Sequence, residues 1–371
     1  MTERLTQLLH DEATGLVPPP PDAASVIGAG RRIRQRRRVT GAVVATVAAV
    51  VVTSVGVGLL GGSPEARDVG PTSPDAATPA PAAYGVGSDV HVGDRVAQVP
   101  DTVHSLHYTS VGVLVRSNPN GGASDGSGPE SLTLVRWDGS TEDLGTIPEG
   151  VGPATDPARD VYVLAEPEGD GFVAVVRDAG TGEVVQTVPL PDLPPSYWEV
   201  PPLTLDADRL FVGYRTKTAV VDLATGETSI AEGLDGGMQL VRGGHVVAGD
   251  GESLSVLDAA TGQPVLDVEV EPGTAPYGML SPDGRFLRVV RQDLPPGAED
   301  VMQVYDVSTG SVQEFAGSDG WGWTSDGDPF RVGGGTLTRC EADTGDCTDS
   351  PAPGGPGTNA DVRLGGMTYE S

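Results

Sequence analysis

The sequence predicts an all-β protein, a β-propeller of four-stranded blades preceded by one transmembrane helix. Two observations predict this fold. Residues 39–60 contain no charged residue, and a short Asp-x-x-Thr-Gly motif occurs four times after position 177, with a fifth, degenerate copy. Apolar residues make up 38% of the 371 residues, which is enough for a β-rich domain with a thin core.

Charge is divided unevenly along the chain. Residues 1–38 hold seven arginines and four acidic residues, a net charge of +3, whereas residues 39–371 hold 16 basic and 48 acidic residues, a net charge of −32. The sum is the −29 of the whole chain. An acid excess of this size repels phosphates, which excludes a general nucleic-acid-binding role.

The uncharged stretch 39–60 is long enough for a transmembrane helix, because a bilayer core requires about 20 apolar residues. Six arginines between positions 31 and 38 precede it, and basic residues stay on the cytoplasmic side. We therefore expect a single-pass protein of the cell membrane, with its N-terminus cytoplasmic and its C-terminal domain extracellular. A cleaved signal peptide, or a twin-arginine export signal at Arg37 and Arg38, is the alternative to this uncleaved signal anchor.

The segments that flank the span are too short or too polar to form domains. In the cytoplasmic head, 1–38, four consecutive prolines from Pro18 end a first short helix, and 38 residues cannot bury a core. The head is a topology determinant or, alternatively, a docking peptide. Residues 61–83 are rich in Pro and Ala, which is typical of a disordered linker.

The repeated motif predicts a series of tight β-hairpins in residues 84–371. Each copy has apolar residues before the Asp and after the Gly; the copies begin at Asp178, Asp222, Asp258 and Asp306, with Glu341 in the degenerate one. The Asp side chain accepts hydrogen bonds from turn amides, and the Gly adopts a positive φ.

A second turn pattern precedes most of these hairpins, near Arg159, Arg209, Arg285 and Asp328, and completes a unit of four strands in about 40 residues. Six units begin near His104, Pro153, Leu203, Met238, Tyr277 and Trp321. The remaining segments, 89–100 and 361–367, are expected to join as one split blade, because this closes the ring and hides the edge strands. Seven blades are predicted; six are the alternative.

The Asp-x-x-Thr-Gly hairpins, with the turn Ser281-Pro-Asp-Gly284, resemble the WD-like, TolB-like and quinoprotein-type propeller repeats. The arginine-rich head resembles those of actinobacterial membrane proteins, some of which regulate sigma factors. The quinoprotein repeat places a Trp four residues after the Gly. The corresponding residues here are Gln186, Ile230, Leu266, Glu314 and Asp349. No quinone or other cofactor is therefore expected.

Cys340 and Cys347 flank the degenerate motif and are the two cysteines of the chain. Six intervening residues place them on the two arms of a hairpin, where facing residues are close enough for a disulfide. In an oxidising compartment they are expected to pair.

No candidate for catalysis or metal binding has a complete pattern. Ser124 matches G-x-S-x-G but lacks the strand and helix that this motif requires. His104 and His107 lie three apart on a predicted strand, so they are expected on opposite faces. Asp326 and Asp328, with Asp319 nearby, are the candidates for a Ca²⁺ site, and turn formation is the alternative reason for them.

Four aromatic residues are candidates for partner binding. Tyr197 and Trp198 lie in a proline-rich connection, and Trp321 and Trp323 begin the sixth unit. Large aromatic side chains over a propeller face are typical partner anchors, and packing between blades is the alternative.

Together these features predict a monomeric, non-catalytic propeller that binds an unidentified protein or cell-envelope ligand at the cell surface. Two alternatives remain. The head engages a cytoplasmic regulator such as a sigma factor, which makes the protein a transmembrane signalling protein, or the propeller is an enzyme acting on glycan or redox substrates.

Overall fold

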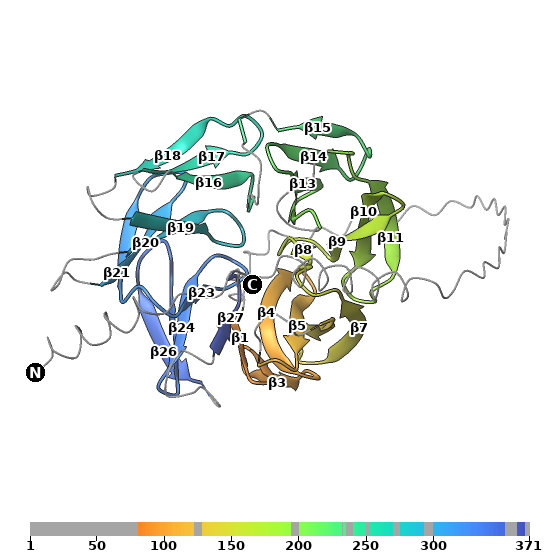
Figure 1. Ribbon diagram of the computed structural model, residues 1–371. Helices are drawn as coiled ribbons and strands as arrows, with labels where there is room; N and C mark the ends of the chain where they lie inside the picture. Colours follow the sequence, from red (N-terminus) through yellow and green to blue (C-terminus); the bar gives the residue numbers. More distant parts are fainter. Residues whose placement is uncertain are drawn as a thin grey trace, which may run out of the picture. The chain divides into compact units, whose positions relative to one another are not determined.

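The computed structural model describes residues 81–121, 128–193, 200–231, 233–234, 240–249, 253–269, 275–292, 300–352 and 362–367. Regular structure in these residues consists of 27 strands in seven antiparallel sheets, which form a ring (Figure 1). The space enclosed by the residues that line the cavity inside this ring is called the channel. No helix in these ranges is long and apolar enough to cross a membrane. The predicted span 39–60, with the head and nearly all of the linker, lies outside the described residues.

The sheets are numbered here as blades in chain order. Blade 1 contains β4 (Thr102–Thr109), β5 (Gly112–Asn118), β6 (Glu130–Arg136) and β7 (Thr141–Ile147). Blade 2 contains β8 (Ala154–Thr155), β9 (Val161–Glu168), β10 (Gly171–Asp178) and β11 (Val184–Pro189). Blade 3 contains β12 (Leu203–Asp206), β13 (Arg209–Gly213), β14 (Thr218–Asp222) and β15 (Thr228–Ile230).

Blade 4 contains β16 (His245–Gly249), β17 (Leu254–Asp258) and β18 (Pro264–Val268). Blade 5 contains β19 (Ala275–Leu280), β20 (Phe286–Gln292), β21 (Val301–Asp306) and β22 (Val312–Ala316). Blade 6 contains β23 (Trp321–Trp323), β24 (Pro329–Gly333), β25 (Thr336–Cys340) and β26 (Cys347–Pro351). Blade 7 contains β27 (Val362–Leu364), β1 (Ala83–Val86), β2 (Asp89–Val92) and β3 (Arg95–Gln98).

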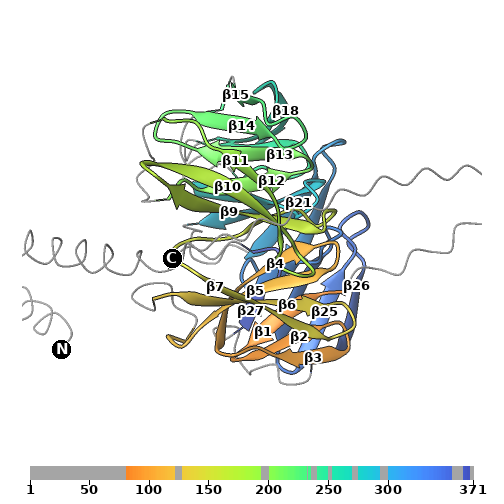
Figure 2. The ribbon, with the colours of Figure 1, turned by 90° about the vertical axis from the view of Figure 1, so that its right-hand side faces the viewer.

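Blade 7 is built from both ends of the propeller, so the prediction of seven blades with one split is confirmed. The C-terminal strand β27 pairs with β1, with Leu364 opposite Tyr84, and Figure 2 shows the two strands side by side. The first strand begins at Ala83, the last residue of the predicted linker. The side chain of Ala83 is buried in the core, so this residue belongs to the propeller. Tyr108 Oη donates to the carbonyl of Trp323 at 2.8 Å, which joins blades 1 and 6 beside the closure.

The Asp-x-x-Thr-Gly motifs form the tight turns that the sequence predicts. They connect the two outermost strands of their blades. Asp306 Oδ1 accepts the amides of Ser308 and Thr309, both at 2.8 Å, and Gly310 has a φ of +72°. The motif is therefore self-contained, because its hydrogen bonds span three residues.

Blade 4 differs from the predicted four strands. Its sheet has three, and the chain that precedes β16 contacts it through one isolated bridge between Arg242 and His245. Gly243 and Gly244 both have positive φ values, +55° and +77°, and turn the chain tightly between the bridge partners. Arg242 thus lies next to the channel on a short, irregular segment.

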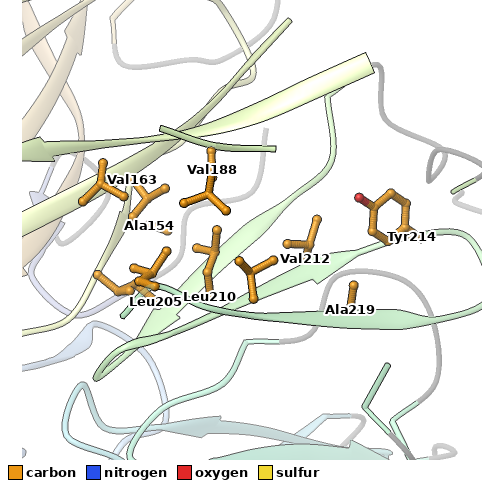
Figure 3. Close-up of a cluster of buried hydrophobic side chains, with 12 residues drawn as sticks. Ala154, Val163, Val188, Leu205, Leu210, Val212, Tyr214 and Ala219 are labelled. Atoms are coloured by element: carbon orange, nitrogen blue, oxygen red, sulfur yellow. The ribbon is translucent and has the colours of Figure 1, made fainter. Parts of the chain in front are cut away.

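The hydrophobic core of the described residues is divided among seven clusters, each between neighbouring blades. The cluster between blades 2 and 3 is drawn in Figure 3. It includes Val163 and Val188 from blade 2 and Leu210 and Val212 from blade 3. A single blade is one sheet thick and cannot bury both of its faces alone, so the ring depends on contacts between blades.

The disulfide prediction is also confirmed. Cys340 on β25 lies directly opposite Cys347 on β26, with a Cα–Cα distance of 4.0 Å, and the two sulfurs are bonded. The bond connects the two outer strands of blade 6.

Candidate functional site

A cavity of 540 Å³ occupies the central channel. Its volume lies within the range of small-molecule sites, about 300–1,000 Å³. Apolar side chains form much of its wall and include Leu203, Leu205, Val247, Leu254, Met279 and Met367. Polar side chains enter it from blade 1 and from the segment before β16 in blade 4. This combination of an apolar wall and a few polar groups makes the channel the candidate site.

A buried hydrogen-bonded network lies at the blade 1 side of the cavity. Nε and Nη2 of Arg116 contact Oε2 of Glu130 at 2.7 and 2.6 Å. Nδ1 of His104 donates to Oε1 of the same carboxylate at 2.9 Å. Glu130 is fully buried, and an ion pair with additional hydrogen bonds is what a buried carboxylate requires.

The network keeps Glu130 ionised. Burial raises the pKa of its carboxyl, but the hydrogen bond from His104 and the charge of Arg116 outweigh burial, so the pKa lies below its usual value. For Arg116, burial lowers the pKa and the charge of Glu130 raises it. The carboxylate is therefore committed to protein partners rather than to a metal ion or a ligand.

A β-bulge decides where the two histidines of β4 point. Strict alternation along the strand predicts opposite faces for His104 and His107, and that prediction is wrong. Val103 pairs with Ser117 and Ser105 pairs with Arg116, so His104 is an extra residue without a partner in β5. The extra residue shifts the alternation by one position, and both histidines line the same cavity.

His107 is neutral in the channel. Burial, then the charges of Arg116 and Arg242 and the neighbouring His104, lower its pKa to about 3. Its Nε2 lies 2.9 Å from Oγ of Ser105, and its Nδ1 has no partner among the described residues. A neutral imidazole donates one hydrogen bond and accepts one, so Nδ1 of His107 is left for a ligand in the cavity that this residue lines.

Arg242 reaches the cavity from blade 4. Its Nη1 donates to the carbonyl oxygens of Leu280 at 3.0 Å and Gly366 at 3.1 Å, which connects blade 4 to blades 5 and 7. Burial lowers its pKa to about 10, while Asp283 and Tyr277 act in the opposite direction. Arg242 is therefore charged at neutral pH, and no carboxylate of the described residues forms an ion pair with it.

Carboxyl groups lie at the ends of the innermost strands and connect neighbouring blades. Asp156 accepts the amide of Ala207 at 2.7 Å, and Asp206 accepts the amide of Gly244 at 3.1 Å. Both acids line the cavity. Burial raises the pKa of Asp206, and the amides of Gly244 and Gly243 act against it.

The aromatic candidates are placed differently from a surface anchor. Trp321 and Trp323 are 2% and 0% exposed and pack in the cluster between blades 5 and 6, which favours the packing alternative. Tyr197, Trp198 and Ser124 lie outside the described residues.

The acidic candidates for Ca²⁺ share an arginine. Nη2 of Arg339 lies 2.6 Å from Oδ2 of Asp328 and 3.4 Å from Oδ2 of Asp326. Within the described ranges, no three His, Cys, Asp or Glu side chains are grouped so that they could hold a metal ion. Turn formation and the arginine account for both acids, and the Ca²⁺ site stays a prediction.

Two signals in the sequence point to the channel network. Arg116 lies within the apolar strand GVLVRSN, whose seven residues are all buried, and Glu130 begins the apolar strand ESLTLVR. A charge inside such a strand must find a partner, because an unpaired buried charge is costly. Arg242 has no comparable signal, because its neighbours in the cavity come from other blades.

No protein-family model and no curated protein matches the sequence. Solved structures resemble the fold at low identity. The β-propeller domain of Cps50 (Swd1) from Myceliophteria thermophila is 12% identical, with a TM-score of 0.41, and the match covers 68% of this chain and 86% of that one. TolB from Acinetobacter baumannii is 13% identical, with a TM-score of 0.41, and the match covers 76% of this chain and 65% of that one. BamB from Moraxella catarrhalis is 14% identical, with a TM-score of 0.36, and the match covers 72% of this chain and 81% of that one.

Proposed function

We propose that this chain is a non-catalytic, monomeric propeller that binds a ligand or partner at the cell surface, held there by residues 39–60. The observation that supports binding is the channel cavity, beside which Arg116 is paired with Glu130 and the pKa of His107 lies far below neutral pH. Propeller rings offer such a cavity together with a broad face for a partner.

The pKa values favour binding over acid–base catalysis. A general acid or base works best when its pKa is near the working pH. Glu130 has a lowered pKa and accepts bonds from Arg116 and His104, whereas the pKa of His107 is about 3. Neither group changes its protonation state near pH 7, so both present fixed donors and acceptors.

An enzyme remains the alternative that one observation favours. Asp206 lines the cavity, and burial raises its pKa toward the range of a general acid. Its oxygens already accept the amide of Gly244, which is a structural role. Turnover of glycan or redox substrates by the full chain, abolished by Asp206→Asn, would establish the alternative and contradict the proposal.

The extracytoplasmic location is supported by two features. A disulfide joins Cys340 to Cys347, and disulfides persist in oxidising compartments. The charge changes from +3 in residues 1–38 to −32 in the rest, which matches a basic cytoplasmic end and an acidic outer domain. In the signalling alternative, the head binds a sigma factor or a similar regulator, which a pulldown with residues 1–38 would detect.

Labelling in intact cells tests the location. A cysteine introduced at Val185, which is 56% exposed, is expected to react with a membrane-impermeant maleimide in intact cells. A matched cysteine at Thr2 is expected to react only after lysis. The reverse pattern would contradict the proposed topology.

In-cell crosslinking of the full chain, followed by mass spectrometry, tests the binding function. Crosslinks from one recurrent partner to residues of the propeller are expected. The absence of any recurrent crosslink, together with substrate turnover, would contradict a binding role.

A further inference from the structure

Arg242 lines the channel and has a pairing edge that no described residue occupies. Arginine pairs side-on with an acid through Nε and Nη2, which point the same way and match two oxygens. In Arg242, Nη1 is held by Leu280 and Gly366, whereas Nε and Nη2 have no partner among the described residues. Neither nitrogen is among the buried side-chain atoms of those residues that lack a partner, and Arg242 lines the cavity, so this edge is the part of Arg242 that a ligand in the cavity could contact.

Arg116 shows what this edge does when it is occupied. Its Nε and Nη2 both contact one oxygen of Glu130, Oε2, at 2.7 and 2.6 Å. The two arginines thus line one cavity, one with its edge filled by a carboxylate of the protein and the other with the same edge open. Because the first arginine is already neutralised, an additional anion is expected at Arg242.

The surroundings of Arg242 select the kind of anion. Asp206 lines the cavity and Asp283 is close enough to influence Arg242, so a dianion would meet repulsion that a monoanion largely avoids. The wall is apolar where Leu254, Met279 and Met367 lie, and it can enclose a hydrocarbon body. His107 adds a neutral donor or acceptor to the same cavity.

We propose that the channel is a binding site for a small organic acid, whose single carboxylate pairs with Nε and Nη2 of Arg242 and whose apolar body packs against the wall of blades 4 and 5. This names the ligand class of the binding function proposed above and rests on it. His107 contacts the acid and orients it. Nη1 stays bonded to Leu280 and Gly366, so the guanidinium is already positioned before the ligand enters.

The test is isothermal titration of the full chain in nanodiscs with 4-phenylbutyrate, with empty nanodiscs as the blank. The neutral isostere 4-phenylbutyramide and the dianion 3-phenylpropyl phosphate are titrated in parallel. We expect the carboxylate to bind and each of the other two probes to bind at least about tenfold more weakly, since a charge-assisted pair contributes about 1.5–3 kcal/mol. Equal binding of the amide, or tighter binding of the phosphate, would overturn the proposal.

The protein side of the test uses Arg242→Gln, with Arg285→Gln as the matched control. Arg285 carries the same charge as Arg242, but its side chain is 57% exposed. We expect Arg242→Gln to weaken carboxylate binding about 10- to 100-fold and Arg285→Gln to leave it unchanged. Unchanged binding in Arg242→Gln would overturn the proposal. If that variant does not fold, the comparison of acid and amide on the unmodified chain still decides the matter.

The acid site can be refuted without refuting the proposed binding function. Loss of acid binding with crosslinks to a partner retained would refute the acid site and leave the binding role intact. Substrate turnover would refute the binding role whether or not the acid binds.

Discussion

Lowering the pH from 7.5 to 5 is expected to destabilise the propeller through His107. In the unfolded chain its pKa is near 6.5, whereas in the channel it is about 3. Between these values the unfolded state binds a proton that the folded state does not bind, so the free energy of unfolding falls as the pH falls. Above pH 6.5 both states are neutral at His107 and the effect vanishes.

The size of the effect follows from this difference in pKa. A pH of 5 lies about 1.5 units below the pKa of His107 in the unfolded chain. At about 1.4 kcal/mol per unit, the free energy of unfolding is therefore lowered by about 2 kcal/mol. The loss would continue toward about 5 kcal/mol at pH 3, where carboxylates also titrate. The window from pH 7.5 to 5 is therefore the informative one.

Urea unfolding of the full chain in detergent, with and without His107→Gln, measures this contribution. Tryptophan fluorescence reports it, because Trp321 and Trp323 are buried in the core. We expect the stability of the unmodified chain to fall about 2 kcal/mol more than that of the variant between pH 7.5 and 5. If the stabilities of the unmodified chain and the variant fall by the same amount between pH 7.5 and 5, the placement of a neutral His107 in the channel is refuted. Comparison with the variant removes the contributions of the other histidines.

Three further substitutions test the network, the ring closure and the disulfide. Glu130→Gln is expected to cost about 3–5 kcal/mol, because it leaves a buried guanidinium without its carboxylate; a loss under about 1 kcal/mol in urea unfolding would contradict this. A Cβ at Gly365 would overlap a tyrosine hydroxyl of blade 1 beside the closing strand, so Gly365→Ala is expected to destabilise the ring by about 1–3 kcal/mol. The control is Gly171→Ala, whose Cβ would meet only a distant carbonyl oxygen. Thermal melts are expected to show almost no change for this control. Replacing Cys340 and Cys347 by Ser is expected to cost about 2 kcal/mol, from the closure of a short loop; equal melting of oxidised and reduced protein would argue against it.

Much of the architecture was predictable because its signals are local. The Asp of each hairpin motif bonds amides two and three residues away, as Asp178 does with Gly180 and Thr181, so the turn forms from its own sequence. The spacing of these turns then limits the number of blades. The disulfide followed in the same way, because Cys340 and Cys347 lie on one hairpin.

The channel site was not predictable from such signals. His104 and His107 share the cavity because of one bulge in β4, and a strand pattern does not encode a bulge. Trp321 and Trp323 are the two ends of the short strand β23, and both are buried because blades 5 and 6 pack around them. Burial of this kind depends on the neighbouring blade.

By itself, therefore, the sequence determined the hairpins, the repeat length, the split closing blade and the cysteine pair, since each depends on residues that are near one another in the chain or on simple counting. Only the tertiary structure decided the candidate site. Arg116 and Arg242 belong to blades 1 and 4, and they face one cavity only when the ring has closed. The ring then determines what pairs with each guanidinium: Glu130 pairs with Arg116, whereas no carboxylate of the described residues pairs with Arg242.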